Sequence, residues 1–220
     1  MSIKNLLAKI FQTKNNNNVA QPELNRERIA AHEAAHGVVW YLFKDKWTVN
    51  SLTIERNGLP DERMNGALHI TANFDVNGQN SIERANELFA IALAGLVGQN
   101  TIVLHQRENL LLEIMAASHF SQVLDESGCG GDYEIAREYL THLGNVFQTS
   151  EGAFTKYKIC DLVSMFQDHR KVQQVHARLT LLLIEKGTLS RVELINFFEG
   201  ENFQEYIEEE NLDINFFHRR

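Results

Sequence analysis

The segment His32-Glu33-Ala34-Ala35-His36 constrains this chain more than any other part of its sequence. Histidines four residues apart share a face when the backbone is helical, so the segment requires a helix whose two imidazoles can point at one ion. The alanines between them favour a helix, and Ile29 and Val39 beside the segment give it apolar neighbours. The spacing therefore predicts a helix that carries a metal site.

Glu33 lies beside the two candidate ligands and can reach a water molecule at the ion without binding the ion itself. A zinc ion lowers the pKa of such a water molecule towards about 7, and a neighbouring carboxylate can take its proton as the oxygen attacks a carbonyl. The alternative is that both histidines only occupy a half-buried helix face. The motif predicts one zinc ion per chain bound by His32 and His36, with Glu33 as the general base.

A catalytic zinc site usually has three protein ligands, and the sequence offers several candidates for the third. They are Asp132, Glu108, Glu113, His105 and His119. Asp132 stands out because it follows the glycine-rich segment Ser127–Gly131, which can bring the backbone close to another helix. The same position also suits an ordinary helix N-cap. Glu113 is the third ligand in the alternative of a gluzincin-like site.

Apolar spacing along the chain predicts a mainly α-helical fold with a small β-sheet. Only two of the 220 residues are proline, which is consistent with long helices. Helices are expected over residues 26–43, 81–104, 108–124, 132–147 and 154–186, followed by a short helix capped by Ser190 and Glu193. The β-prone segments 49–54 and 68–74 are expected to form a strand pair.

One folded domain is expected over residues 23–200, between two polar ends. Residues 1–22 include Asn15-Asn16-Asn17-Asn18, which has no apolar face to bury, so we expect a flexible leader. Residues 201–220 include Glu208-Glu209-Glu210, so we expect a loosely held acidic tail.

Charge and hydropathy indicate a cytoplasmic protein that does not bind nucleic acid. The net charge is −8, which repels a phosphate backbone. The longest uncharged run, 88–104, is shorter than the about 20 residues that span a bilayer, and residues 1–10 lack the pattern of a secretory signal. We therefore expect no stable membrane insertion, with an amphipathic surface anchor at residues 3–11 as the alternative.

Several segments resemble, in order, the protease domain of FtsH-type zinc metalloproteases. They are His32–His36, the strand-like Val49–Glu55, the apolar segment ending in Ala94–Gln99, the loop Gly128–Asp132 and the segment Lys186–Glu193. The resemblance implies a mainly helical protease domain with His32, His36 and Asp132 as zinc ligands and Glu33 as catalytic base. Family members are membrane-bound and ATP-dependent, whereas no G-x-x-x-x-G-K-[ST] motif occurs in this chain.

The resemblance without that motif implies an ATP-independent zinc metallopeptidase acting on peptides or unfolded protein segments. Its further partners would be other copies of the chain or a separate ATPase. The segment Leu68–Phe74 is a candidate edge strand for pairing with an extended substrate. A function of another class is a non-proteolytic, metal-binding adaptor or regulator derived from such a protease. Gln99 favours the adaptor, because the family has an acidic side chain in that segment.

Overall fold

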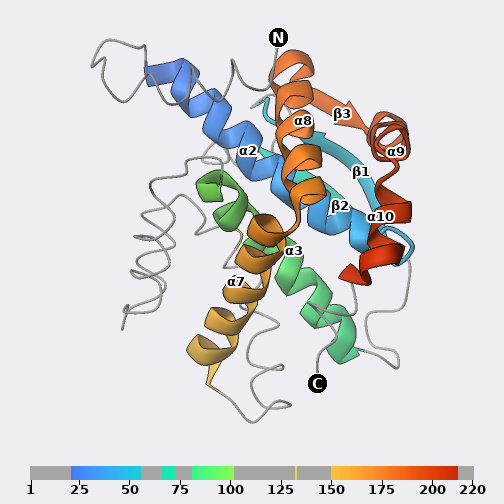
Figure 1. The fold of residues 1–220 in the computed structure, drawn as a ribbon. Helices are drawn as coiled ribbons and strands as arrows, with labels where there is room; N and C mark the ends of the chain where they lie inside the picture. Colours follow the sequence, from blue (N-terminus) through green and yellow to red (C-terminus); the bar gives the residue numbers. More distant parts are fainter. Residues whose placement is uncertain (1–20, 56–65, 73–80, 102–131, 133–149, 213–220) are drawn as a thin grey trace.

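The computed structural model describes residues 21–55, 66–72, 81–101, 132 and 150–212. Within these residues the fold is mainly α-helical with a small antiparallel sheet, as the sequence predicted (Figure 1). The helices are α2 (Gln21–Leu42), α3 (Ser81–Thr101), α7 (Glu151–Asp168), α8 (Arg170–Lys186), α9 (Arg191–Gly200) and α10 (Phe203–Glu210), and the strands are β1 (Trp47–Thr53), β2 (Ala67–Ala72) and β3 (Thr188–Ser190). None of the described helices has the length and apolar character needed to cross a lipid bilayer.

Helix α2 lies at the centre of the fold and carries the two histidines of the motif. It makes its most extensive contacts with α3 and α8 (Figure 1). Every residue from Ala30 to Tyr41 is buried, so this part of the helix has no solvent-facing side. Because a helix buried all round is normally apolar, the buried polar residues of the motif need a specific explanation.

Small residues allow α3 to approach α2 closely beside the motif. A Cβ atom placed on Gly98 would lie 2.1 Å from the Cβ atom of Ala35 and 3.2 Å from the carbonyl oxygen of Ala31. No side chain fits at position 98 without moving one of the two helices. The pair Gly98 and Ala35 therefore sets the distance between α2 and α3.

The sheet has the order β2-β1-β3, with β1 antiparallel to both neighbours. The strand pair predicted from the sequence is present, with Leu52 opposite Leu68. A third strand, β3, was not predicted; it is only three residues long and pairs Leu189 with Leu52. Since β1 is central, β2 is an edge strand of the sheet within the described residues.

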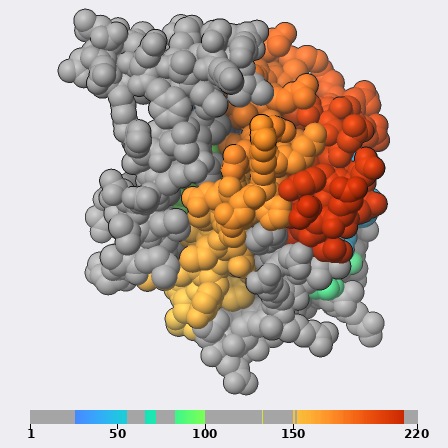
Figure 2. All heavy atoms as spheres, viewed as in Figure 1, coloured from blue at the N-terminus to red at the C-terminus, as the bar shows by residue number. Residues whose placement is uncertain are grey.

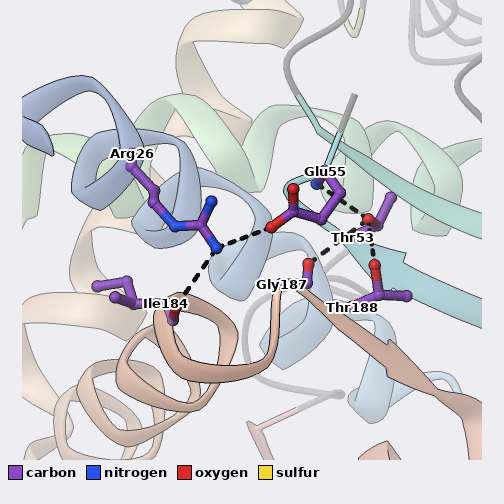
Figure 3. Close-up of polar contacts among 6 residues, drawn as sticks. All are labelled: Arg26, Thr53, Glu55, Ile184, Gly187 and Thr188. Atoms are coloured by element: carbon purple, nitrogen blue, oxygen red, sulfur yellow. Dashed lines mark hydrogen bonds and ion pairs between the residues drawn. The ribbon is translucent and has the colours of Figure 1, made fainter. Parts of the chain in front are cut away.

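A cluster of polar contacts joins the start of α2 to the end of α8 and to the sheet (Figure 3). Arg26 Nη2 donates to Glu55 Oε1 at 2.7 Å and to the carbonyl oxygen of Ile184 at 3.5 Å. Gly187 ends α8 with φ of 77°, and a Cβ atom there would lie 2.4 Å from Glu55 Oε1. The positive φ favours glycine at position 187, and the predicted end of this helix is confirmed.

The prediction of one continuous helix over residues 154–186 is wrong. The chain breaks at His169, whose φ of −103° and ψ of 98° are those of extended backbone, so α7 and α8 are separate helices. The side-chain amide of Gln173 donates to the carbonyl oxygen of Gln167 at 2.6 Å and satisfies a group that the break leaves without its helical partner. No proline or glycine marks this break, so the sequence pattern gave no sign of it.

The acidic segment after residue 200 also differs from its prediction. Residues 203–210 form α10, and Phe203, Ile207 and Leu212 are buried in the core, whereas we expected a loosely held tail. Buried Glu201 accepts a hydrogen bond from Arg178 of α8 at 2.9 Å. The atoms of α8, α9 and α10 form one continuous surface in Figure 2. The acidic residues occupy only the outer side of a helix that has an apolar inner side.

Other predictions fall outside the described residues and cannot be compared with the structure. They are the leader up to residue 20, the helices over 108–124 and 132–147 apart from Asp132 itself, the loop Ser127–Gly131 and the tail beyond residue 212.

The docking of α10 predicts that Phe203→Ala lowers the free energy of unfolding by about 3–5 kcal/mol, the usual cost of deleting a buried phenyl ring. Urea unfolding followed by circular dichroism measures this change. The matched control is Glu209→Ala on the exposed side of α10, which we expect to change stability by about 0.5 kcal/mol or less. Equal, small effects of the two substitutions would contradict the docking of α10.

Candidate metal centre

Nitrogen and oxygen atoms of His32, His36 and Asp132 meet at one point. His32 Nε2 lies 3.0 Å from His36 Nε2 and 2.9 Å from Asp132 Oδ2, and His36 Nε2 lies 3.4 Å from the same Oδ2. The spacing of four residues on α2 brings the imidazoles together, while Asp132 reaches them from 100 residues further along the chain. The structure therefore brings together the three residues that the sequence selected.

These three side chains fit a divalent metal ion. In tetrahedral zinc sites the bonds to nitrogen and oxygen are about 2.0–2.1 Å, which places the ligand atoms about 3.3 Å apart. The separations here are 2.9, 3.0 and 3.4 Å. Lone pairs of two neutral imidazoles and a carboxylate repel one another at such distances unless a cation or a proton lies among them. The group can thus hold a metal ion. Among the described residues, these three ligands leave one position of a tetrahedral site free for another molecule.

The other candidates for the third ligand, Glu108, Glu113, His105 and His119, lie outside the described residues. Burial acts to raise the pKa of Asp132, but the charges of His36 and His32 and a hydrogen bond from His32 hold it well below its ordinary value. Asp132 is therefore ionised at neutral pH, which is the form that binds a cation.

The second nitrogen of His36 is held by α3. Its Nδ1–H donates to the carbonyl oxygen of Ile91 at 2.6 Å, and this bond fixes the tautomer in which Nε2 carries the lone pair. Histidine ligands of metal ions usually have such a partner on the other ring nitrogen, because it orients the ring and increases its basicity. The sequence analysis did not anticipate this contact, since it depends on which carbonyl of α3 faces α2.

Gly95, one turn after Ile91, lies against both imidazoles. A Cβ atom at Gly95 would lie 2.4 Å from His32 Nε2 and 2.5 Å from His36 Nε2, far closer than any real side-chain contact. The backbone of α3 thus forms one wall of the centre, and a larger residue at position 95 would displace both rings. The sequence contains a signal for this wall, because Gly95 and Gly98 recur three residues apart on an otherwise apolar helix.

Glu33 is buried beside the ligands, and its carboxylate has an atom without a partner. Its exposed fraction is 5%, and Oε2 accepts no hydrogen bond from the part of the chain that the structure describes. Burial raises the pKa of Glu33 to about 7, although the charges of His32 and His36 act to lower it. A carboxyl group with a pKa near neutrality can both accept and release a proton at physiological pH.

The other two buried glutamates among the described residues are paired with cations. Glu87 accepts hydrogen bonds from Lys46 and, at 3.0 Å, from Trp47 Nε1. Glu201 Oε1 lies 2.8 Å from Arg178 Nη1 and forms an ion pair with it. These two carboxylates join elements of the fold, and their charges are neutralised locally. Glu33 has no cationic Lys or Arg partner of this kind in the described structure, and this sets it apart from the two carboxylates that join elements of the fold.

A third histidine, His176 of α8, holds the turn of α2 that precedes the ligands. Its Nε2–H donates to the carbonyl oxygen of Ala31 at 2.8 Å, and its ring meets the edge of Phe166. Burial lowers the pKa of His176 to about 4, so the ring is neutral under ordinary conditions. The sequence analysis missed this residue, since a single histidine on an amphipathic helix carries no distinctive pattern.

Comparison with known proteins adds no relative from which a function can be carried over. No protein-family model matches the chain, and no curated protein shows significant similarity to it. The chemistry of the described side chains is therefore the basis for a functional assignment.

The geometry predicts that Asp132→Ala lowers metal affinity by at least about tenfold, because a ligand is lost while the imidazoles remain. Metal content after dialysis against a fixed zinc concentration, measured by atomic emission, tests this. Glu113→Ala is the comparison variant, and we expect it to retain its metal. Loss of metal from Glu113→Ala with retention in Asp132→Ala would assign the third ligand to Glu113.

Gly95→Ala is predicted to weaken metal binding by about 10–100-fold, the usual effect of disturbing the residues that orient the ligands. The added methyl group overlaps both imidazoles, so the rings cannot keep their present positions. Competition with a fluorescent zinc chelator gives the affinity. Gly200→Ala is the matched control, since a Cβ atom there meets nothing within 4 Å. Wild-type affinity in Gly95→Ala would show that α3 does not form the wall of the centre.

Proposed function

We propose that the protein is an ATP-independent, cytoplasmic zinc metallopeptidase with a protease domain of the FtsH type, acting on peptides or unfolded segments. The observation that carries the proposal is the buried carboxylate of Glu33, whose Oε2 has no hydrogen-bond partner among the described residues, beside three converging ligands. Two imidazoles and a carboxylate are a donor set that zinc accepts in catalytic sites.

His32, His36 and Asp132 would hold the zinc ion, which would supply Lewis acidity to polarise a peptide carbonyl and make water more acidic. Glu33 accepts the proton of the water molecule that attacks the scissile carbonyl carbon. The C–N bond then breaks, and Glu33 returns that proton to the leaving amine. The bond from His36 to the Ile91 carbonyl keeps the imidazole in place throughout the cycle.

The edge strand β2 supports an extended peptide as the substrate. Gly66, the residue before β2, lies against Glu33, so the edge of the sheet begins at the proposed base. An extended chain can add to such an edge through backbone hydrogen bonds, which do not depend on its sequence. A folded protein offers few extended segments free to pair, so unfolded segments and short peptides are the substrates we favour.

Glu33→Gln is predicted to lower the rate of casein hydrolysis by at least about 100-fold while leaving the zinc content unchanged, because the amide cannot accept the proton. Fluorescence release from labelled casein measures the rate. Glu199→Gln, an exposed substitution on α9, is the matched control and should match wild type.

Equal rates for Glu33→Gln and wild type, or cleavage that survives removal of the metal by a chelator, would contradict the peptidase. A zinc-loaded wild-type protein that cleaves no peptide at all would instead favour the non-proteolytic adaptor.

A further inference from the structure

Gly66 meets Glu33 along most of the glutamate side chain. A Cβ atom at Gly66 would lie 2.6 Å from Oε1, 2.7 Å from Cγ and 2.8 Å from Cδ of Glu33. Three atoms of one side chain within 3.0 Å mean that the glutamate lies flat on the backbone at this position. Gly66 does not have a positive φ, so glycine is needed there for space alone.

The backbone at Gly66 is fixed by the sheet. The next two residues pair with β1, Ala67 with Thr53 and Leu68 with Leu52, and Leu52 is fully buried. The backbone of α2 at Glu33 is fixed as well, because all neighbours of Glu33 on the helix from Ala30 to Tyr41 are buried. A side chain at position 66 could therefore be accommodated only by moving the carboxylate.

We infer that Gly66 is a positioning residue for Glu33: its missing side chain lets the carboxylate lie between α2 and the start of β2, beside the three ligands. This inference rests on the proposed function. The two glycines have different roles, because Gly95 leaves space for the imidazoles and Gly66 leaves space for the proposed base. Substitution of Gly66 disturbs the base and leaves the ligands in place.

The contact is tested by a double-mutant cycle on the zinc-loaded protein, with the thermal unfolding midpoint as readout. Gly66→Ala should lower the midpoint by about 4 °C or more. In the Glu33→Ala background, which lacks Oε1, Cγ and Cδ, the same change should move it by about 1 °C or less. Gly200→Ala should have the same small effect in both backgrounds. If Gly66→Ala alone fails to fold, Glu33→Ala must restore folding. A midpoint shift that is equal in both backgrounds overturns the inference.

The positioning role is tested by the kinetics of peptide hydrolysis. Gly66→Ala should bind zinc like wild type and keep KM within about twofold, while kcat falls about 100-fold, the effect of misplacing a reacting group by about 1 Å. A general loss of structure would instead lower zinc content or change KM. Wild-type kcat in Gly66→Ala overturns the inference while leaving the peptidase in place. Absence of cleavage by the wild-type protein overturns the proposed function, whatever the stability cycle shows.

Discussion

The complete burial of the middle of α2 is the constraint on which the rest of the structure depends. Burying two imidazoles and a carboxylate costs several kcal/mol unless each polar atom finds a partner. Around His32 and His36 these partners include the carboxylate of Asp132 and the carbonyl oxygen of Ile91, and α3 approaches both rings closely at Gly95. A helix with the same motif on a solvated face would need none of them. The burial therefore explains why α3 has a glycine and an accepting carbonyl group next to the two imidazoles.

Buried glutamates fall into two kinds in the described part of this protein. Glu87 and Glu201 are neutralised by lysine or arginine, and each joins segments that are distant in the sequence. At the centre of α2 the negative groups face imidazoles instead of lysine or arginine side chains. A divalent cation held by His32, His36 and Asp132 would neutralise these negative groups. The same cation would act on Glu33, since a nearby positive charge favours the ionised form and opposes the effect of burial on its pKa.

Local patterns in the sequence predicted those features that depend on a few neighbouring residues. The helix that carries His32–His36 follows from two histidines four residues apart, and the strand pair follows from alternating apolar residues. The helix end at Gly187 follows from a single glycine. Features that depend on distant partners could not be predicted in this way. The break at His169 has no local breaker residue, and α10 looks acidic until Phe203 and Ile207 are seen to be buried. Asp132 was selected from the sequence as one of five candidates, and only the fold shows its distance to the imidazoles.

The two glycines at the centre show why a short motif specifies so little of a site by itself. His32–His36 fixes the direction of two ligands and a base, yet the motif says nothing about the surfaces that must face them. Gly95 on α3 and Gly66 before β2 are 29 residues apart in sequence, and each is the point where the backbone of another element comes within contact distance of a motif side chain. Neither needs a positive φ, so a turn or a bulge does not account for either one. Their common cause is the lack of space around α2, which follows from its burial. At Gly95 and Gly66, a glycine without a conformational role thus marks a place where a side chain of the motif touches the backbone of a neighbouring element.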